Sequence, residues 1–316
     1  MTETFVILLG LVFAGYFALA GYDYGVGSLL TAVARTDVER RYALGALGPF
    51  FLGNEVWLVA GLGLLLGAFP LADGVLLSGL YPILIGLIGA IVAFTALVQL
   101  RSRLSGARRL VDGVIVAAGV LIGIGWGAAF GALLQGLPVR IGPLPILFGL
   151  LMVALFVLHG AVLLASRTHG VVAERARRIA TRMVHPAVVL VVVTGLAAAL
   201  DGDAIRNPVF AVAGAGVLAA SVGAAGRAVR AGRLGIGLVA SGAAAAMPVL
   251  IVGAATAPYL VVHSGGESVT FAAAIAGDVS LAFMTAAVVP LLPVLLAFQA
   301  ATWWIWRRAP RRPNFY

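Results

Sequence analysis

The chain of 316 residues has no cysteine and no lysine, and charged residues make up only 10% of it. The absence of cysteine excludes disulfides, iron–sulfur clusters and thiolate metal sites. Soluble domains usually carry about 25% charged residues, so the charges here are too few to cover a water-facing surface. Hydrophobic residues make up 62% of the chain. The composition therefore predicts a polytopic membrane protein.

Apolar stretches and charged breaks alternate along the whole chain, and many stretches reach the roughly 20 residues that a bilayer core requires. The sequence predicts an all-α protein with nine transmembrane helices in a single integral membrane domain, residues 1–316. We place the helices at 5–34, 43–70, 77–100, 112–135, 144–166, 185–200, 208–226, 234–262 and 272–306. The first helix lacks a basic start and a clear cleavage site, so we interpret it as a span rather than a signal peptide.

The arginines are distributed unevenly over the loops between these helices. Nineteen of the 21 basic residues follow the first, third, fifth, seventh or ninth predicted helix, and only Arg140 and Arg206 lie on the opposite loops. Because basic loops stay on the cytoplasmic side of a membrane, we predict an N-terminus outside and a C-terminus in the cytoplasm. Topology thus accounts for the net charge of +9, and we do not expect nucleic acid as a partner.

Two acidic residues lie inside the predicted spans. Asp23 precedes Arg35 by 12 residues, and Glu55 follows Arg41 by 14 residues. At a rise of ~1.5 Å per residue, these separations put both carboxyls at a similar depth. Ionisable side chains inside a bilayer are costly, so the two acids could form a proton relay. The alternative is a pair of neutral, hydrogen-bonded packing residues.

His159 is the one histidine that lies well inside a predicted span. It could titrate, ligate a haem or form a hydrogen bond to a neighbouring helix. A bis-ligated haem needs a second axial ligand at matched depth, so we expect no haem bound by this chain alone. Asp112 and Asp278 lie near predicted helix starts, where they could cap the helix or interact with its dipole.

Two blocks of motifs carry a family resemblance. The first block consists of Gly21-Tyr22-Asp23-Tyr24-Gly25-Val26-Gly27, Glu39-Arg40-Arg41, Gly48-Pro49-Phe50 and Gly53-Asn54-Glu55-Val56-Trp57-Leu58. The second consists of Leu158-His159-Gly160-Ala161 followed by Arg167-Thr168-His169-Gly170. In order and spacing these blocks resemble subunit II of cytochrome bd-type quinol oxidases, with Asn54 and His159 among the polar residues of the motifs.

The resemblance implies a fold of two four-helix bundles plus one peripheral helix in the bacterial cytoplasmic membrane. It also implies a haem-bearing partner, subunit I, which holds haems of b and d type and oxidises quinol while dioxygen is reduced to water. Small single-helix subunits, quinone and lipids are further partners in such complexes. This chain is then expected to stabilise the complex and to contribute a proton path or a gas route. Trp57 is a candidate for lining the gas route or packing against a partner haem, with ordinary core packing as the alternative.

Four positions depart from the family pattern. Leu52 and Ala20 stand where the family often has acidic residues, and Phe94 and Gln99 stand where Arg and Glu are common. A proton path that used those groups cannot operate unchanged. We hypothesise that Asp23 and Glu55 provide a path displaced by about one helical turn, since Leu52 and Glu55 share a helix face.

Two other functions remain open at this point. A proton-coupled secondary transporter also uses intramembrane carboxyls, although the odd helix count and the lack of a visible inverted repeat argue against it. A purely structural subunit of the oxidase, with proton entry left wholly to the partner, is the second alternative.

Overall fold

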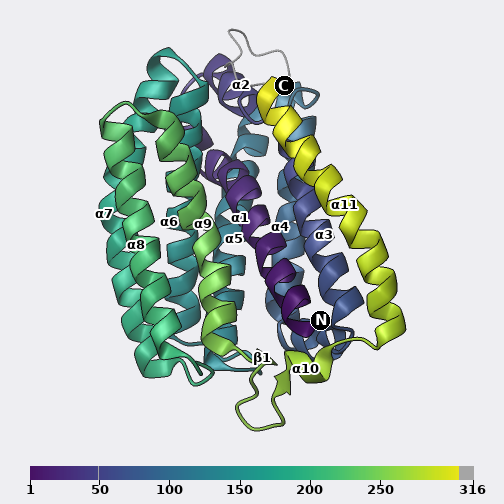
Figure 1. The fold of residues 1–316 in the computed structure, drawn as a ribbon. Coiled ribbons are helices and arrows are strands. Elements are labelled where there is room, and N and C mark those ends of the chain that lie inside the picture. Colours follow the sequence, from purple (N-terminus) through teal and green to yellow (C-terminus); the bar gives the residue numbers. More distant parts are fainter. Residues whose placement is uncertain (49, 306–316) are drawn as a thin grey trace.

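The computed structural model describes residues 1–48 and 50–305, which form a bundle of long helices (Figure 1). The long helices are α1 (Thr2–Val33), α3 (Phe51–Ala68), α4 (Tyr81–Leu100), α5 (Arg108–Gln135), α6 (Pro143–Arg167), α7 (Gly170–Asp201), α8 (Pro208–Arg230), α9 (Leu234–Thr256) and α11 (Asp278–Ile305). The short elements are α2 (Asp37–Gly45), the turns η1 (Asp73–Leu77) and η2 (Ser105–Ala107), the strands β1 (Tyr259–Val261) and β2 (Val269–Thr270), and α10 (Phe271–Ala274).

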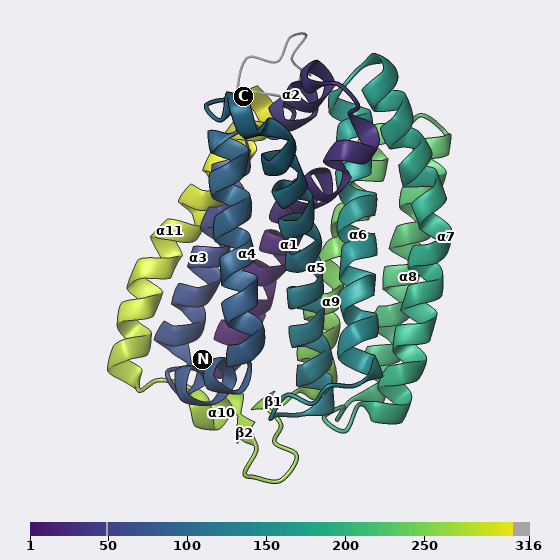
Figure 2. The same ribbon diagram turned by 180° about the vertical axis from the view of Figure 1, so that it is seen from behind.

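Nine helices in the described part of the chain are long and apolar enough to cross a membrane, as the sequence predicts. Consecutive spans run in opposite directions, so the arginine-rich segments between them gather at the end of the bundle that holds α2 (Figures 1 and 2). The side of the membrane that this end faces stays a prediction. The division into two four-helix bundles and a peripheral helix also stays a prediction.

The predicted second span, 43–70, is wrong at its start. Residues Asp37–Gly45 form the separate helix α2, and α3 begins only at Phe51. The Thr36 hydroxyl accepts a hydrogen bond from the Glu39 N–H at 3.2 Å, and the Glu39 carboxylate accepts one from the Arg35 N–H at 2.6 Å. This reciprocal arrangement resembles a capping box and fixes the first turn of α2.

The predicted sixth span, 185–200, also starts in the wrong place. α7 begins at Gly170 and continues through Pro186 to Asp201. Glu174 and Arg178 pair at 3.4 Å across one turn of its charged first part. Helix formation needs no apolar residues outside the bilayer, so α7 extends through the arginine-rich stretch that the hydropathy pattern assigns to a loop.

The last two predicted spans are too long. The eighth, 234–262, ends at Thr256, because the following segment forms the small antiparallel sheet of β1 and β2. The ninth, 272–306, begins at Asp278 after the short helix α10, and residue 306 lies outside the described residues. The protein is therefore helical apart from one two-stranded sheet within the described part of the chain.

α1 and α6 occupy the centre of the bundle. α1 contacts α3, α5, α6 and α9, and α6 contacts α5, α7 and α9 as well. In the most apolar stretch of α6, 78% of the residues are buried, against 6% in α11, which lies at the edge (Figure 1). α1 and α6 approach closely at Gly25 and Gly160, because a Cβ atom at Gly25 would lie 1.8 Å from the Phe156 carbonyl oxygen. Small residues commonly permit such contacts between membrane helices.

The substitution Gly25→Ala is expected to separate α1 from α6 and to destabilise the protein by about 1–3 kcal/mol, as overpacking usually does. The thermal midpoint of the intact complex, purified in mild detergent, measures this loss. Gly216→Ala on α8 is the matched control, since a Cβ atom there would meet no atom within 4 Å. An equal effect of the two substitutions would contradict the close approach of α1 and α6.

Candidate functional site

Asp23 lies on α1 at the centre of a group of polar side chains inside the bundle. It is fully buried, and its Oδ2 accepts a hydrogen bond of 2.8 Å from the Asn54 amide on α3. The same amide donates to the Tyr22 hydroxyl at 2.8 Å. The Asn54 carbonyl oxygen accepts a bond of 3.2 Å from the Gln299 amide on α11. Asn54 thus joins α1, α3 and α11 through one buried amide.

Glu55 belongs to a second polar group, which reaches α5. The Tyr24 hydroxyl donates to Glu55 Oε1 at 2.9 Å, and the Tyr16 and Tyr24 hydroxyls lie 2.8 Å apart. The Trp126 indole N–H donates to the Tyr16 hydroxyl at 3.3 Å. Since Tyr24 gives its proton to Glu55 and an indole can only donate, Tyr16 donates to Tyr24. The chain of hydrogen bonds therefore runs in one direction, from Trp126 to Glu55.

The predicted pair of carboxyls lies on neighbouring helices but in separate hydrogen-bonded groups. Within the described residues, Asp23 bonds to Asn54 and Glu55 bonds to Tyr24, rather than the two acids to each other. Asp23 Oδ1 is buried and has no hydrogen-bond partner in the part of the chain that the structure describes. The proton-relay role of the two acids stays a prediction.

Several residues of these groups escape prediction from the sequence. Tyr16 and Trp126 look like ordinary apolar-face aromatics in a long hydrophobic stretch, and Tyr22 and Tyr24 belong to the first motif block without a predicted partner. Gln299 lies 245 residues from its partner Asn54. The sequence does show that hydroxyl, indole and amide groups lie inside the spans. Each such group must find a hydrogen-bond partner within the protein, but the sequence does not identify that partner.

His159 on α6 is buried and holds two neighbouring helices. Its Nδ1 lies 2.7 Å from the Ser241 hydroxyl on α9, and its Nε2 lies 2.9 Å from the Ala18 carbonyl oxygen on α1. A haem iron would need one of these nitrogens. Both are engaged, so His159 does not fit the role of an axial ligand and instead joins α1, α6 and α9.

Trp57 is buried on α3 and packs against α1. A Cβ atom at Gly15 would lie 2.4 Å from the Trp57 ring, so the glycine makes room for the indole. This contact accounts for the position of Trp57 within the chain. A role in a gas route or against a partner haem stays a prediction.

The four departures from the family pattern lie in different surroundings. Ala20 and Phe94 are fully buried, and the Phe94 ring packs on Tyr24 with ring centres 5.3 Å apart. Leu52 is 58% exposed, and the Gln99 amide bonds to the Thr95 carbonyl oxygen on its own helix at 3.2 Å. Phe94 thus fills with an aromatic ring the space beside the hydroxyl that serves Glu55.

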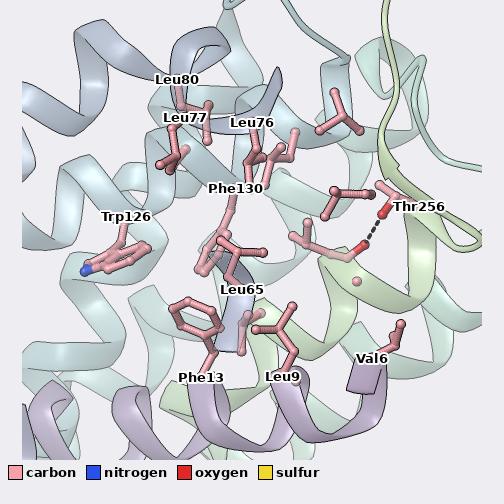
Figure 3. A pocket seen from close by; sticks show the side chains of 18 of the residues that line it. Val6, Leu9, Phe13, Leu65, Leu76, Leu77, Leu80, Trp126, Phe130 and Thr256 are labelled. Carbon is pink, nitrogen blue, oxygen red and sulfur yellow. Dashed lines mark hydrogen bonds between the residues drawn. The ribbon is translucent and has the colours of Figure 1, made fainter. Parts of the chain in front are cut away.

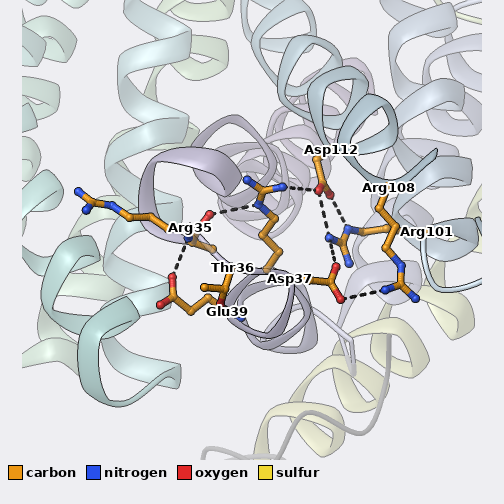
Figure 4. Close-up of polar contacts among 9 residues, drawn as sticks. Arg35, Thr36, Asp37, Glu39, Arg101, Arg108 and Asp112 are labelled. Carbon is orange, nitrogen blue, oxygen red and sulfur yellow. Dashed lines mark hydrogen bonds and ion pairs between the residues drawn. The ribbon is translucent and has the colours of Figure 1, made fainter. Parts of the chain in front are cut away.

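A network of ion pairs lies at the end of the bundle that holds α2 (Figure 4). Asp112 on α5 accepts hydrogen bonds from Arg40 at 2.8 Å and from two nitrogens of Arg101. Asp37 accepts from Arg101 at 2.9 Å and from Arg108 at 3.0 Å. Asp112 and Arg101 are each only 1% exposed. The sequence predicts that Asp112 caps its helix or interacts with the helix dipole. In the structure Asp112 instead forms a buried ion pair with Arg101.

Glu39 joins α2 to α7 at the same end. Its carboxylate accepts the Arg35 N–H and a bond of 2.8 Å from Arg175. The backbone N–H of Arg35 is the main cause that holds the pKa of Glu39 below its ordinary value of 4.5, and Arg175 adds to it. The ionised form of Glu39 therefore stabilises this contact between α2 and α7.

An apolar cavity of about 200 Å³ lies toward the opposite end of the bundle (Figure 3). Side chains of α1, α3, α5 and α9 line it together with residues of η1 and β1, and Leu9, Leu65, Trp126, Phe130 and Thr256 are among them. The Trp126 ring borders this cavity while its N–H belongs to the Glu55 group. The cavity is therefore adjacent to the buried polar groups.

The fold and these buried groups define a polytopic helical membrane protein with ionisable side chains inside its spans. Within the described residues, no group of three or more His, Asp or Glu side chains could hold a metal ion. The expectation that haems lie in a partner subunit stays a prediction.

Comparison with known proteins extends over almost the whole chain. The family model described as cytochrome bd terminal oxidase subunit II matches residues 1–306. The chain is 27% identical over 327 residues to the cytochrome bd ubiquinol oxidase subunit 2 of Bacillus subtilis, covering 97% of this chain and 96% of the relative. It is 30% identical over 203 residues to the cytochrome bd-I ubiquinol oxidase subunit 2 of Escherichia coli K12, covering 58% and 53%.

A solved structure also has the same fold. A chain in the structure of bd oxidase from Geobacillus thermodenitrificans superimposes with a TM-score of 0.75 at 17% identity, covering 96% of this chain and 98% of that one. The chain belongs to the cytochrome bd terminal oxidase subunit II family. The resemblance seen in the motifs is confirmed, and the protein is one subunit of an oxidoreductase.

The substitution Asp112→Asn is expected to lower the free energy of unfolding by about 3 kcal/mol, because it leaves the buried Arg101 short of negative charge. Thermal or denaturant unfolding of the intact complex measures the effect. Asp203→Asn breaks the exposed pair with Arg140 and is expected to cost less than about 1 kcal/mol. Equal losses in the two variants would refute the importance of the buried pair.

Glu39 is expected to make part of the stability pH-dependent. Its folded-state pKa lies below the ordinary value of 4.5, so its contribution is complete at neutral pH and is lost as the pH falls through the folded pKa. Glu39→Gln should therefore lower the thermal midpoint at neutral pH, and the difference from the native chain should shrink in acid. Glu267→Gln, in the exposed turn between β1 and β2, is the matched control for the loss of a carboxylate. A difference that stays constant with pH would contradict this assignment.

Proposed function

We propose that this chain acts as the non-haem subunit II of a quinol-oxidising terminal oxidase of the bacterial cytoplasmic membrane. The family match over residues 1–306 carries this proposal. The Bacillus subtilis and Escherichia coli relatives are named as subunits of ubiquinol oxidases, so quinol is the proposed electron donor and dioxygen the acceptor. Haems of b and d type belong to a partner, subunit I, and small single-helix subunits can complete the complex. Family membership gives the secondary-transporter alternative no support.

The surroundings of Glu55 favour the α3 face as the place where the partner binds. Glu55 is half-buried within this chain, and its neighbours Leu52 and Val56 are 58% and 46% exposed. An ionisable side chain that faces hydrocarbon costs at least about 2.5 kcal/mol. A partner helix over this face removes that cost and brings Glu55 close to the other subunit.

We also propose that Asp23 and Glu55 carry protons toward that partner. The carboxyl of Asp23 keeps Oδ1 free of hydrogen bonds within the described residues, so this oxygen is available to hold a proton. Tyr22 and Tyr24 flank Asp23 on α1, and hydroxyl groups both accept and donate protons. The two acidic groups share no direct hydrogen bond in the described part of the chain, so transfer between them requires an intervening water. The arginine-rich end is the proposed cytoplasmic side from which protons enter.

The neutral side chains at four family positions favour a second possibility, a scaffold role. Phe94 and Ala20 are fully buried, and neither side chain can hold a proton. In this case subunit I takes up every proton, and Asn54 and Asp23 only hold α1 against α3.

Proton uptake by the complex, reconstituted with its native partner in sealed vesicles, separates the two roles. With the relay, Asp23→Asn and Glu55→Gln each slow oxygen-coupled uptake by about tenfold or more, while Thr194→Val does not. Thr194 is a buried hydroxyl on α7, remote in sequence from both acids, which controls for the loss of an internal polar group. Unchanged uptake in both acid variants, with a normal level of assembled complex, would reject the relay and leave the scaffold role.

A further inference from the structure

A large polar cavity opens at the arginine-rich end of the bundle. Its volume is about 1000 Å³, and it lies between the link from α1 to α2, the turn η2 and the first turns of α5. Six charged side chains line it, namely Arg35, Asp37, Arg40, Arg108, Arg109 and Asp112. Figure 4 shows Asp37, Arg108 and Asp112 close together, while the Arg35 side chain extends away from them. Four of the six are cations, so the cavity has an excess of positive charge.

The two carboxylates of the cavity are already neutralised inside the protein. Asp112 is paired with Arg40 and with Arg101, and Asp37 is paired with Arg101 and Arg108. Within the described residues, the guanidinium groups of Arg35 and Arg109 form no hydrogen bond or ion pair. These two arginines therefore keep their full hydrogen-bonding capacity, and the acids nearby cannot satisfy them.

The chemistry of this lining suits a phosphate group. Guanidinium groups bind phosphate oxygens through two parallel hydrogen bonds. α5 begins at Arg108 on the edge of the cavity, and Ala107 provides no side-chain cap. The first N–H groups of this long helix are therefore available to an anion, and the helix dipole favours negative charge there.

The apolar residue at the edge of the cavity points to a lipid as the source of that phosphate. Leu110 lines the cavity and is 71% exposed. It follows Arg109 directly and belongs to a membrane-spanning helix. An amphiphile with an anionic head and an apolar tail matches a cationic cavity that continues into an exposed apolar helix surface.

We infer that this cavity binds a phosphate group through Arg35 and Arg109, and that an anionic phospholipid whose acyl chains lie against α5 supplies it. Asp37 and Asp112 form ion pairs with Arg40, Arg101 and Arg108. These two carboxylates therefore do not compete with the phosphate for Arg35 and Arg109. The inference does not depend on the proton role of Asp23 and Glu55.

The test measures phosphatidylglycerol binding to the intact, delipidated complex by native mass spectrometry. The double variant Arg35→Gln/Arg109→Gln is expected to bind phosphatidylglycerol about tenfold more weakly than the native complex. Arg35→Lys/Arg109→Lys keeps the charge but loses the paired hydrogen bonds, and it should restore only part of the affinity. Arg230→Gln, on the exposed end of α8, is the matched control and should bind as the native complex does. Phosphatidylcholine should bind weakly to all four proteins.

A second arm uses inorganic phosphate and the thermal midpoint of the same proteins. Protection by inorganic phosphate that depends on Arg35 and Arg109, without selective lipid binding, supports the phosphate site and overturns the lipid as its source. Equal lipid binding in the native protein and the Gln double variant, together with no phosphate protection, overturns the site. A loss of binding in Arg230→Gln as large as in the double variant also overturns it, because general surface charge then explains the effect.

Discussion

The hydrogen bond between Asn54 and Asp23 is the interaction on which the arrangement around α1 depends. A membrane interior offers no water, so each buried polar group must find its partner within the protein. Asn54 meets this requirement for Asp23 and Tyr22 and at the same time binds Gln299 on α11. This one amide holds α3 against α1 beside the packing of Trp57 on Gly15, and α3 places Glu55 next to Tyr24. Removing it would leave a buried carboxyl without its only hydrogen-bond donor among the described residues.

The same requirement is met differently at the two ends of the bundle. At the arginine-rich end, charged side chains are paired in a network that joins α2, α5 and the end of α4, and part of it is fully buried. Toward the other end, the walls are almost wholly apolar and enclose the small cavity beside Trp126. The polar groups of Asp23 and Glu55 lie between these regions.

Hydropathy and charge alone predict the number of spans, because both depend on the bilayer rather than on tertiary contacts. They fail where the chain leaves the bilayer, as at α2 and the first turns of α7, since helices there are held by capping and ion pairs. Asp23, Glu55 and His159 could be singled out because ionisable groups are rare in spans, and Asn54 because it belongs to a family motif. Their partners could not, since Gln299, Ser241 and Trp126 reach them only through helix packing.

The departures from the family pattern have a common physical consequence. Replacing an ionisable group in a span by an apolar one removes a desolvation cost, and packing then fills the space. Phe94 shows this directly, because its ring contacts Tyr24 and fits against the space left by Gly27. The acids that remain are those held by hydrogen bonds from neighbouring helices. A carboxyl held in this way is costly to remove, because its loss leaves the neighbouring donors without a partner inside the membrane.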